Sequence, residues 1–200
     1  KKIDIRLSKS CLGSAEKSAV LRVLDNEYLG MGSEVQAFEK ELTIFFDRPA
    51  VCVANGTAAL QLALQAVGLT DGDEVLVQSL TYVASFQAIS ATGATPIACD
   101  IDPLTLCINL ADAQTKLTEN TKAIMPVHYG GAVGDLDGIY DFAKRNGLRV
   151  IEDAAHAFGS YHKSVKVGAV GDIACFSFDG IKNITSGEGG CIVTNDKKVL

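Results

Sequence analysis

Tryptophan is absent from this 200-residue sequence, and proline occurs only four times. No apolar run approaches the roughly 20 residues of a membrane-spanning helix, and the N-terminal segment KKIDIRLSKS lacks the apolar core of a secretory signal. We therefore expect a cytoplasmic protein with no membrane partner. The hydrophobic fraction of 48% and the charged fraction of 21%, with 19 glycines, are typical of a globular α/β protein with one sizeable core.

Clusters of basic residues are also missing. The 24 acidic residues outnumber the 18 lysines and arginines, which gives a formal net charge of −6. A nucleic-acid surface needs lysines and arginines gathered on one face, so we expect no nucleic-acid partner. A small anionic ligand is still compatible with this composition, because it needs only a local positive field.

None of the six cysteines forms a C-x-x-C pair, which argues against a zinc site or a thioredoxin-like motif. Four of them, Cys52, Cys99, Cys175 and Cys191, lie inside apolar runs that resemble strands. Free cysteine behaves there as a small hydrophobic residue. We expect reduced thiols in the core, as in cytoplasmic proteins, and no metal site.

The order of apolar patterns indicates alternating helices and strands. Helical spacing predicts helices over residues 14–27, 33–46, 56–68, 81–93, 110–117 and 135–147. Short apolar runs predict strands over residues 50–54, 73–79, 94–101, 122–129, 148–153, 172–178 and 189–196. Such alternation predicts one α/β domain in which a mostly parallel central sheet is sandwiched by helices.

Ligands of parallel sheets bind at the carboxyl ends of the strands, and the first such end is the segment VANGTAAL. Gly56 and Thr57 would lie at the start of the following helix, where free N–H groups and the helix dipole favour a phosphate. The alternative is an ordinary helix start that is capped by Asn55 or Thr57.

Two other strand ends carry unusual residues. Tyr82 follows one predicted strand, and it would either stack on a flat ring or pack in the core. Asp153 follows another, with His156 three residues later. A carboxylate at that depth needs a partner, but Asp153 could also be a structural cap for the next turn. The Asp-x-x-His spacing alone is no metal signature.

The segment SFDGIKNITSGEGG contains a single cation, Lys182, five residues after Ser177 at a strand end. Lys182 is either a solvated loop lysine or an amine that attacks a carbonyl. A phosphate site, a stacking aromatic ring, a carboxylate and a lysine are together the contacts that pyridoxal phosphate requires. In that reading Lys182 forms a Schiff base with the cofactor, and Asp153 keeps the ring nitrogen protonated.

Several segments, in this order and spacing, resemble the DegT/DnrJ/EryC1/StrS aminotransferases. They are YLGMGSEVQAFEKEL, NGTAAL, GATPIACDID, EDAAHAFGS, GDIACFSF and KNITSGEGG, which together span about residues 27–196. The resemblance implies the aspartate aminotransferase-like fold (fold-type I) of the pyridoxal-phosphate-dependent transferases. It implies that Lys182 binds the cofactor covalently, Asp153 contacts the pyridine nitrogen, Tyr82 stacks on the ring, His156 lies near the phenolic oxygen, and Gly56, Thr57, Ala58 and Ser177 hold the phosphate.

The same resemblance implies an activity and an organisation. The family's enzymes transfer an amino group, usually from L-glutamate, to a nucleotide-linked keto sugar in the biosynthesis of amino sugars and polysaccharides. Its dehydratase branch has histidine where Lys182 stands, so Lys182 favours transamination. Residues 1–200 would be the cofactor-binding large domain with an N-terminal helical segment, without the C-terminal small domain. The family's homodimers build each active site at the subunit interface.

Three alternatives remain open from the sequence. The protein could bind pyridoxal phosphate as a non-catalytic regulator, or it could be another fold-type I enzyme, such as a lyase or an aldolase. A dinucleotide oxidoreductase is disfavoured, because GMGSEV (residues 30–35) lacks the third glycine of that motif. The chain also departs from the family's usual SFHPxKN with SFDGIKN, which puts Asp179 three residues before Lys182.

Overall fold

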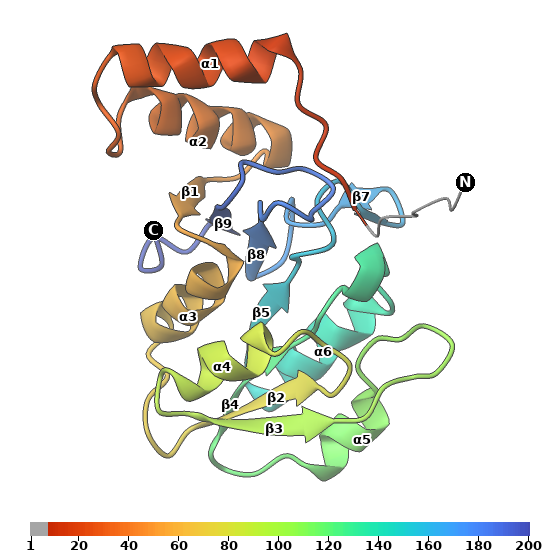
Figure 1. Cartoon of the computed structure of the whole chain (residues 1–200). Coiled ribbons are helices and arrows are strands. Elements are labelled where there is room, and N and C mark those ends of the chain that lie inside the picture. Colours follow the sequence, from red (N-terminus) through yellow and green to blue (C-terminus); the bar gives the residue numbers. More distant parts are fainter. Residues whose placement is uncertain (1–7) are drawn as a thin grey trace.

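A seven-stranded sheet forms the centre of the computed structural model, which describes residues 8–200 (Figure 1). The strands are β1 (Ala50–Val53), β2 (Glu74–Gln78), β3 (Thr95–Cys99), β4 (Thr121–Met125), β5 (Arg149–Asp153), β8 (Ile173–Ser177) and β9 (Gly190–Thr194). Their order is β1-β9-β8-β5-β4-β2-β3. Only β9 is antiparallel to its neighbours β1 and β8, so the predicted, mostly parallel sheet is confirmed.

Helices cover both faces of this sheet, as the alternating pattern predicted (Figure 1). The helices are α1 (Ser14–Asp25), α2 (Ser33–Phe46), α3 (Gly56–Ala66), α4 (Ala84–Ser90), α5 (Leu110–Thr115) and α6 (Leu136–Asn146). One apolar cluster packs α3 and α4 against one face. Two more clusters pack α2, α5 and α6 against the other. Because helices cover both faces of the sheet, its strands are apolar on both sides and show no alternation of polar residues.

The alternation of side chains along a strand assigns the polar residues at the strand ends to one face or the other. Ile151 on β5, together with Ile173 and Cys175 on β8, packs on the α3–α4 side. Asp153 lies two residues after Ile151, and Ser177 lies two residues after Cys175, so both belong to the α3–α4 side. Glu152 lies between Ile151 and Asp153, so its side chain is on the other face, where it contacts Tyr140 of α6. Two carboxylates that are adjacent in sequence thus lie on opposite faces of the sheet.

The pattern missed the shortest elements. A hairpin of β6 (Tyr161–His162) and β7 (Val165–Lys166) follows β5, and the 3₁₀ turn η1 (Tyr129–Gly131) follows β4. Two-residue strands are too short to show periodicity. The predicted helix over residues 81–93 begins only at Ala84, so Tyr82 lies in the connection before it.

All six cysteines carry free thiols, and four are buried. Cys52, Cys99, Cys175 and Cys191 lie on β1, β3, β8 and β9. Cys99, Cys175 and Cys191 are buried in the core, as predicted, whereas Cys52 is only half-buried beside it. Burial raises the pKa of the Cys52 and Cys99 thiols to about 11. Among residues 8–200, no helix is both long enough and apolar enough to cross a membrane.

Candidate active site

The carboxyl ends of β1, β5 and β8 surround a cavity of about 460 Å³. Seven of the eight predicted site residues line it: Gly56, Thr57, Tyr82, Asp153, His156, Ser177 and Lys182. They come from four chain segments that span more than 120 residues of sequence. The fold therefore brings together side chains that the sequence placed only at separate strand ends.

The start of α3 forms one wall of the cavity. The Asn55 side chain caps the helix, because its Oδ1 accepts a 2.8 Å hydrogen bond from the Ala58 N–H. Ala58, the eighth predicted site residue, does not line the cavity. The N–H groups of Gly56 and Thr57 precede the first intrahelical hydrogen bond, which runs from Ala59 to the Asn55 carbonyl. An anion at this wall would meet these two N–H groups and the positive end of the helix dipole.

Two glycines allow the start of α3 to approach β8 and β9. A Cβ atom on Gly56 would lie 2.8 Å from the Cβ of Ser177. A Cβ atom on Gly190 would lie 2.6 Å from the backbone of Asn55. Both distances are shorter than side chains tolerate, so these positions require glycine. The close approach also brings the Ser177 hydroxyl to the start of α3, where its Oγ lies 3.2 Å from the position of a Gly56 Cβ.

Asp153 is only 5% exposed at the end of β5. Its Oδ2 accepts a 2.6 Å hydrogen bond from the Ser85 hydroxyl on α4, and its Oδ1 accepts one of 3.2 Å from the Ala155 N–H. Ser85 in turn shares a 2.7 Å hydrogen bond with Thr81. Two donors fix the carboxylate, which keeps the capacity to accept a further hydrogen bond from a group in the cavity.

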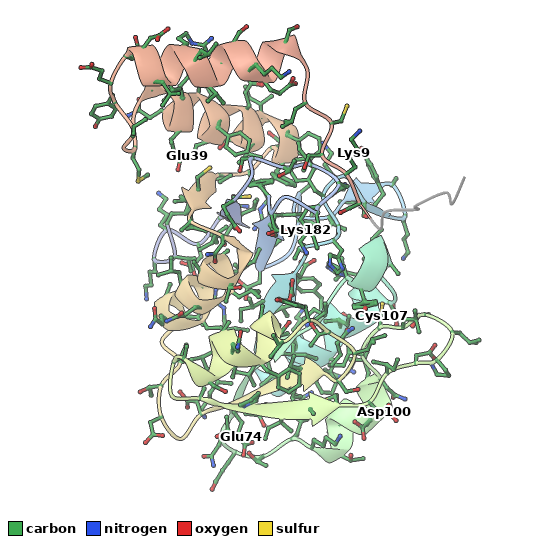
Figure 2. All side chains as sticks on the ribbon, in the orientation of Figure 1. Lys9, Glu39, Glu74, Asp100, Cys107 and Lys182 are labelled. Atoms are coloured by element: carbon green, nitrogen blue, oxygen red, sulfur yellow. The ribbon has the colours of Figure 1, made fainter. Side chains whose placement is uncertain are left out.

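Lys182 lies half-buried in the connection between β8 and β9, and Figure 2 shows it in the middle of the molecule beside β8. A tight turn presents it: the Lys182 N–H bonds to the Asp179 carbonyl at 3.0 Å. The Asp179 side chain accepts the Ile181 N–H, also at 3.0 Å. The alternative of a fully solvated loop lysine does not hold, because Lys182 lines the cavity together with Asp179.

His156 follows β5 in a turn rather than a helix. Its Nδ1 accepts a 3.2 Å hydrogen bond from the Gly130 N–H, and the Tyr129 ring packs edge-on against the imidazole. Burial lowers the pKa of His156, and the charge of Lys182 lowers it further, while Asp153 acts in the opposite direction. The imidazole therefore favours its neutral form.

Tyr82 is 69% exposed at the mouth of the cavity, which excludes the alternative that it packs in the core. The sequence reasoning missed Ser85, Tyr129 and the lining role of Asn55. It also assigned no role to Glu188, which lines the cavity as well. The one available signal for Ser85 was a hydroxyl inside the otherwise apolar segment VASF (residues 83–86). Its partner could be found only in three dimensions.

The cavity fits pyridoxal phosphate by the chemistry of its groups. The glycine-dependent wall at Gly56 offers N–H groups and a hydroxyl for the phosphate. A buried, oriented carboxylate and a lysine face the same space. Within residues 8–200, no three histidine, cysteine, aspartate or glutamate side chains gather to hold a metal ion. The fold is therefore that of the fold-type I, pyridoxal-phosphate-dependent transferases, and the cavity carries the groups that this cofactor requires.

Comparison of the sequence with protein families gives the same result. Residues 10–200 match the DegT/DnrJ/EryC1/StrS aminotransferase family. The chain therefore belongs to this family, which depends on pyridoxal phosphate.

Curated relatives are similar over almost the whole chain. It is 48% identical to the GDP-perosamine synthase of Escherichia coli O157:H7, over 93% of this chain and 52% of that protein. It is 42% identical to the spore coat polysaccharide biosynthesis protein SpsC of Bacillus subtilis (strain 168), over 94% of this chain and 49% of that protein. The chain thus spans about half the length of the curated relatives that it matches.

Solved structures agree with the fold. The putative sugar aminotransferase Spr1654 from Streptococcus pneumoniae, in its PLP form, superimposes with a TM-score of 0.93 at 30% identity, covering 99% of this chain and 55% of that one. DesV from S. venezuelae superimposes with a TM-score of 0.90 at 38% identity, covering 93% of this chain and 51% of that one.

Proposed function

We propose that this protein, in its full-length form, is a pyridoxal-phosphate-dependent aminotransferase that transfers an amino group from L-glutamate to a nucleotide-linked keto sugar. The observation that carries the proposal is one cavity that combines Lys182, the buried Asp153 and the anion-accepting start of α3. Membership of the family supports the same activity.

Each of the seven predicted residues that line the cavity has a role in this proposal. Lys182 holds the cofactor covalently, and Asp153 accepts the hydrogen bond of the pyridine N–H. The N–H groups of Gly56 and Thr57, with the Ser177 hydroxyl, bind the phosphate. Tyr82 stacks on the ring, because an exposed aromatic side chain at the cavity mouth can cover a flat ligand at little entropic cost. His156 donates a hydrogen bond to the phenolic oxygen.

The cofactor, when bound, supplies a ring that withdraws electrons from the carbon carrying the transferred amino group. Asp153 sustains this property, since a carboxylate beside the ring nitrogen keeps that nitrogen protonated. Lys182 would also be the base that removes the proton from the donor's α-carbon, because its amine lines the same cavity as Asp153.

The relatives also narrow the substrate. Two GDP-perosamine synthases, from E. coli O157:H7 and Caulobacter vibrioides, are 48% and 45% identical to this chain. We therefore propose that the keto sugar is linked to GDP. Turnover of GDP-linked keto sugars in preference to UDP- or dTDP-linked ones would support this, and the reverse order would contradict it.

The site also bears on assembly. Tyr82, Val83 and Ile181 are 69%, 51% and 62% exposed, and Tyr82 and Ile181 line the cavity. We propose that a second copy covers them in a cytoplasmic homodimer whose active site lies at the interface. Residues 1–200 would be the cofactor-binding large domain of each subunit, which is completed by a C-terminal small domain. Light scattering of the full-length protein tests the dimer.

Borohydride reduction of the protein loaded with pyridoxal phosphate, followed by peptide mass mapping, tests the covalent link. The proposal expects a pyridoxyl group on Lys182 and no adduct in Lys182→Ala. A pyridoxyl group on another lysine, or Lys182→Ala with the parent rate of transamination, would overturn the assignment.

Addition of L-glutamate separates the aminotransferase from its alternatives. Loss of the bound cofactor's visible absorption with formation of 2-oxoglutarate supports transamination. An unchanged spectrum with glutamate and with other amino donors favours a non-catalytic regulator. Cleavage of a carbon–carbon or carbon–heteroatom bond in the substrate identifies a lyase or an aldolase. Asp153→Asn should slow the glutamate half-reaction, and an unchanged rate would contradict its role.

A further inference from the structure

A buried pair of ionisable side chains lies behind the cavity, on the opposite face of β5 from Asp153. Glu152 is completely buried and His128 is 1% exposed. The His128 Nε2 and the Glu152 Oε2 are 2.8 Å apart. The second carboxylate oxygen of Glu152 accepts a 2.6 Å hydrogen bond from the Tyr140 hydroxyl. The function proposed above leaves this pair without a role.

His128 itself does not line the cavity, although both of its neighbours in the chain do. Val127 and Tyr129, on either side of it, line the cavity. The His128 N–H bonds to the Asp153 carbonyl at 3.0 Å. Within residues 8–200, the other ring nitrogen of His128 has no hydrogen-bond partner. Glu152 is therefore the polar anchor that holds this side chain, and with it the start of the turn η1.

The turn η1 packs against His156. Gly130 and Gly131 have φ angles of 61° and 86°, a conformation that glycine adopts without strain. A Cβ on Gly131 would lie 3.2 Å from the His156 carbonyl, so the turn packs closely on the segment after β5. The Gly130 N–H is donated to the His156 Nδ1 at 3.2 Å. A ring nitrogen that accepts a hydrogen bond carries no proton, so the proton of the neutral ring is on Nε2.

We propose that Glu152 and His128 are positioning residues that hold the turn η1 in place, so that the Gly130 N–H fixes His156 as the Nε2–H tautomer. A neutral His156 in this form presents a donor, and not an acceptor, to an anionic oxygen in the cavity. The catalytic meaning of this donor rests on the proposed function. The tautomer of His156 does not rest on the proposed function, because the contacts from Glu152 to His156 are all made by protein groups.

A purely stabilising role explains the pair less well. Burying two ionisable groups is costly, and well-packed apolar side chains in place of a buried ion pair often give equal or greater stability. The pair instead lies where its geometry matters, since His128 is flanked by two cavity-lining residues and is two residues before the N–H donor to His156. The Glu152–His128 pair therefore serves to orient the turn η1 more than to stabilise the fold.

NMR of the cofactor-free, ¹⁵N-histidine-labelled full-length protein tests the proposal directly. His156→Gln identifies the His156 signals by their loss from the spectrum. At pH 8 we expect an unprotonated Nδ1 and a protonated Nε2 in His156. A protonated Nδ1 would overturn the proposal. Because no turnover is measured, failure of the aminotransferase function would leave this result unchanged.

Variants of Glu152 test the positioning role. Glu152→Ala should give a mixture of His156 tautomers and exchange of the Gly130 amide hydrogen about tenfold faster, since local opening becomes easier. Glu152→Gln retains the volume and weakens the charge-assisted hydrogen bond by about half, so it should shift both readouts in the same direction even if Glu152→Ala does not fold. Unchanged His156 signals in a folded Glu152 variant would overturn the positioning role.

Tyr140→Phe is the matched control, because it removes the other hydrogen bond of Glu152 and leaves His128 untouched. We expect the His156 tautomer to remain as in the parent protein. A shift as large as that of Glu152→Ala would show that the effect does not pass through His128, and would overturn the proposed route.

Discussion

The Ser85 hydroxyl donates a 2.6 Å hydrogen bond to the Asp153 Oδ2 at the end of β5, from 68 residues away in the sequence. Both side chains are buried, Ser85 completely. The hydroxyl fixes the orientation of the carboxylate that we propose contacts the pyridine nitrogen. The site therefore depends on α4 as well as on the strand that carries Asp153.

Loss of this hydroxyl should impair the site without unfolding the protein. In Ser85→Ala, Asp153 keeps only the Ala155 N–H as donor. A hydrogen bond to a charged group contributes about 1.5–3 kcal/mol, so we expect the glutamate half-reaction to slow about tenfold or more. Stopped-flow absorption measures the rate. Ser90→Ala, an exposed position on the same helix, is the control; an equal loss there would contradict the explanation.

Gly56→Ala should weaken cofactor binding. The new Cβ would lie 2.8 Å from the Ser177 Cβ, so the start of α3 must move away from β8 and the phosphate donors separate. We expect the dissociation constant of pyridoxal phosphate to rise about tenfold or more, a change of about 1.4 kcal/mol. Fluorescence titration measures it. Gly30→Ala, whose Cβ would lie 3.8 Å from the Tyr28 ring, should bind normally.

Asp179, where the chain departs from the family's usual SFHPxKN, lies between Ser177 and Lys182 and bonds to the segment on both sides. Its side chain accepts the Ile181 N–H at 3.0 Å, and its N–H bonds to the Ser177 hydroxyl at 3.3 Å. Asp179→Ala removes the side-chain acceptor, worth about 1 kcal/mol, and should slow covalent attachment of the cofactor about fivefold. Asp179→Asn keeps an acceptor oxygen and should stay close to the parent rate. Equal losses in both variants would instead point to the charge.

Arg48 should be important for stability rather than for chemistry. This 4% exposed side chain donates to the carbonyls of Gly168, Val170, Gly171 and Asp172 at 2.7–3.2 Å. Arg48→Leu leaves these acceptors without their donor and should lower the free energy of unfolding by about 3 kcal/mol or more.

Urea denaturation measures the effect of Arg48→Leu. The exposed Arg145 of α6 serves as the control, since Arg145→Leu should change the free energy of unfolding by less than about 0.5 kcal/mol. Similar losses in the two variants would contradict the explanation from the buried carbonyls.

The cysteines should differ in reactivity. Burial raises the pKa of Cys52 and Cys99 to about 11, so at pH 7.5 both are thiols and not the reactive thiolates. Cys11 is the exposed cysteine. Iodoacetamide at pH 7.5 should modify Cys11 first. Rapid labelling of Cys99 in the native protein would contradict its burial.

The sequence by itself determined the alternation of helices and strands, because apolar spacing reports directly which faces are buried. It also determined the candidates at the strand ends. Asp153 and Ser177 end buried strands, Gly56 follows a strand, and Lys182 comes five residues after Ser177. Parallel sheets gather such strand ends at one edge. Its family motifs are local in the chain, so they could be read without coordinates.

Only the tertiary structure decided how these groups are oriented. Ser85 meets Asp153, and Gly130 meets His156, across connections whose geometry depends on packing between α4, β4 and β5. Contacts between distant segments likewise decide three other features. Tyr82 is exposed, Ala58 does not line the cavity, and Glu152 pairs with His128 in the interior. Apolar periodicity shows which face of an element is buried, but it carries no information on which polar atoms will meet there.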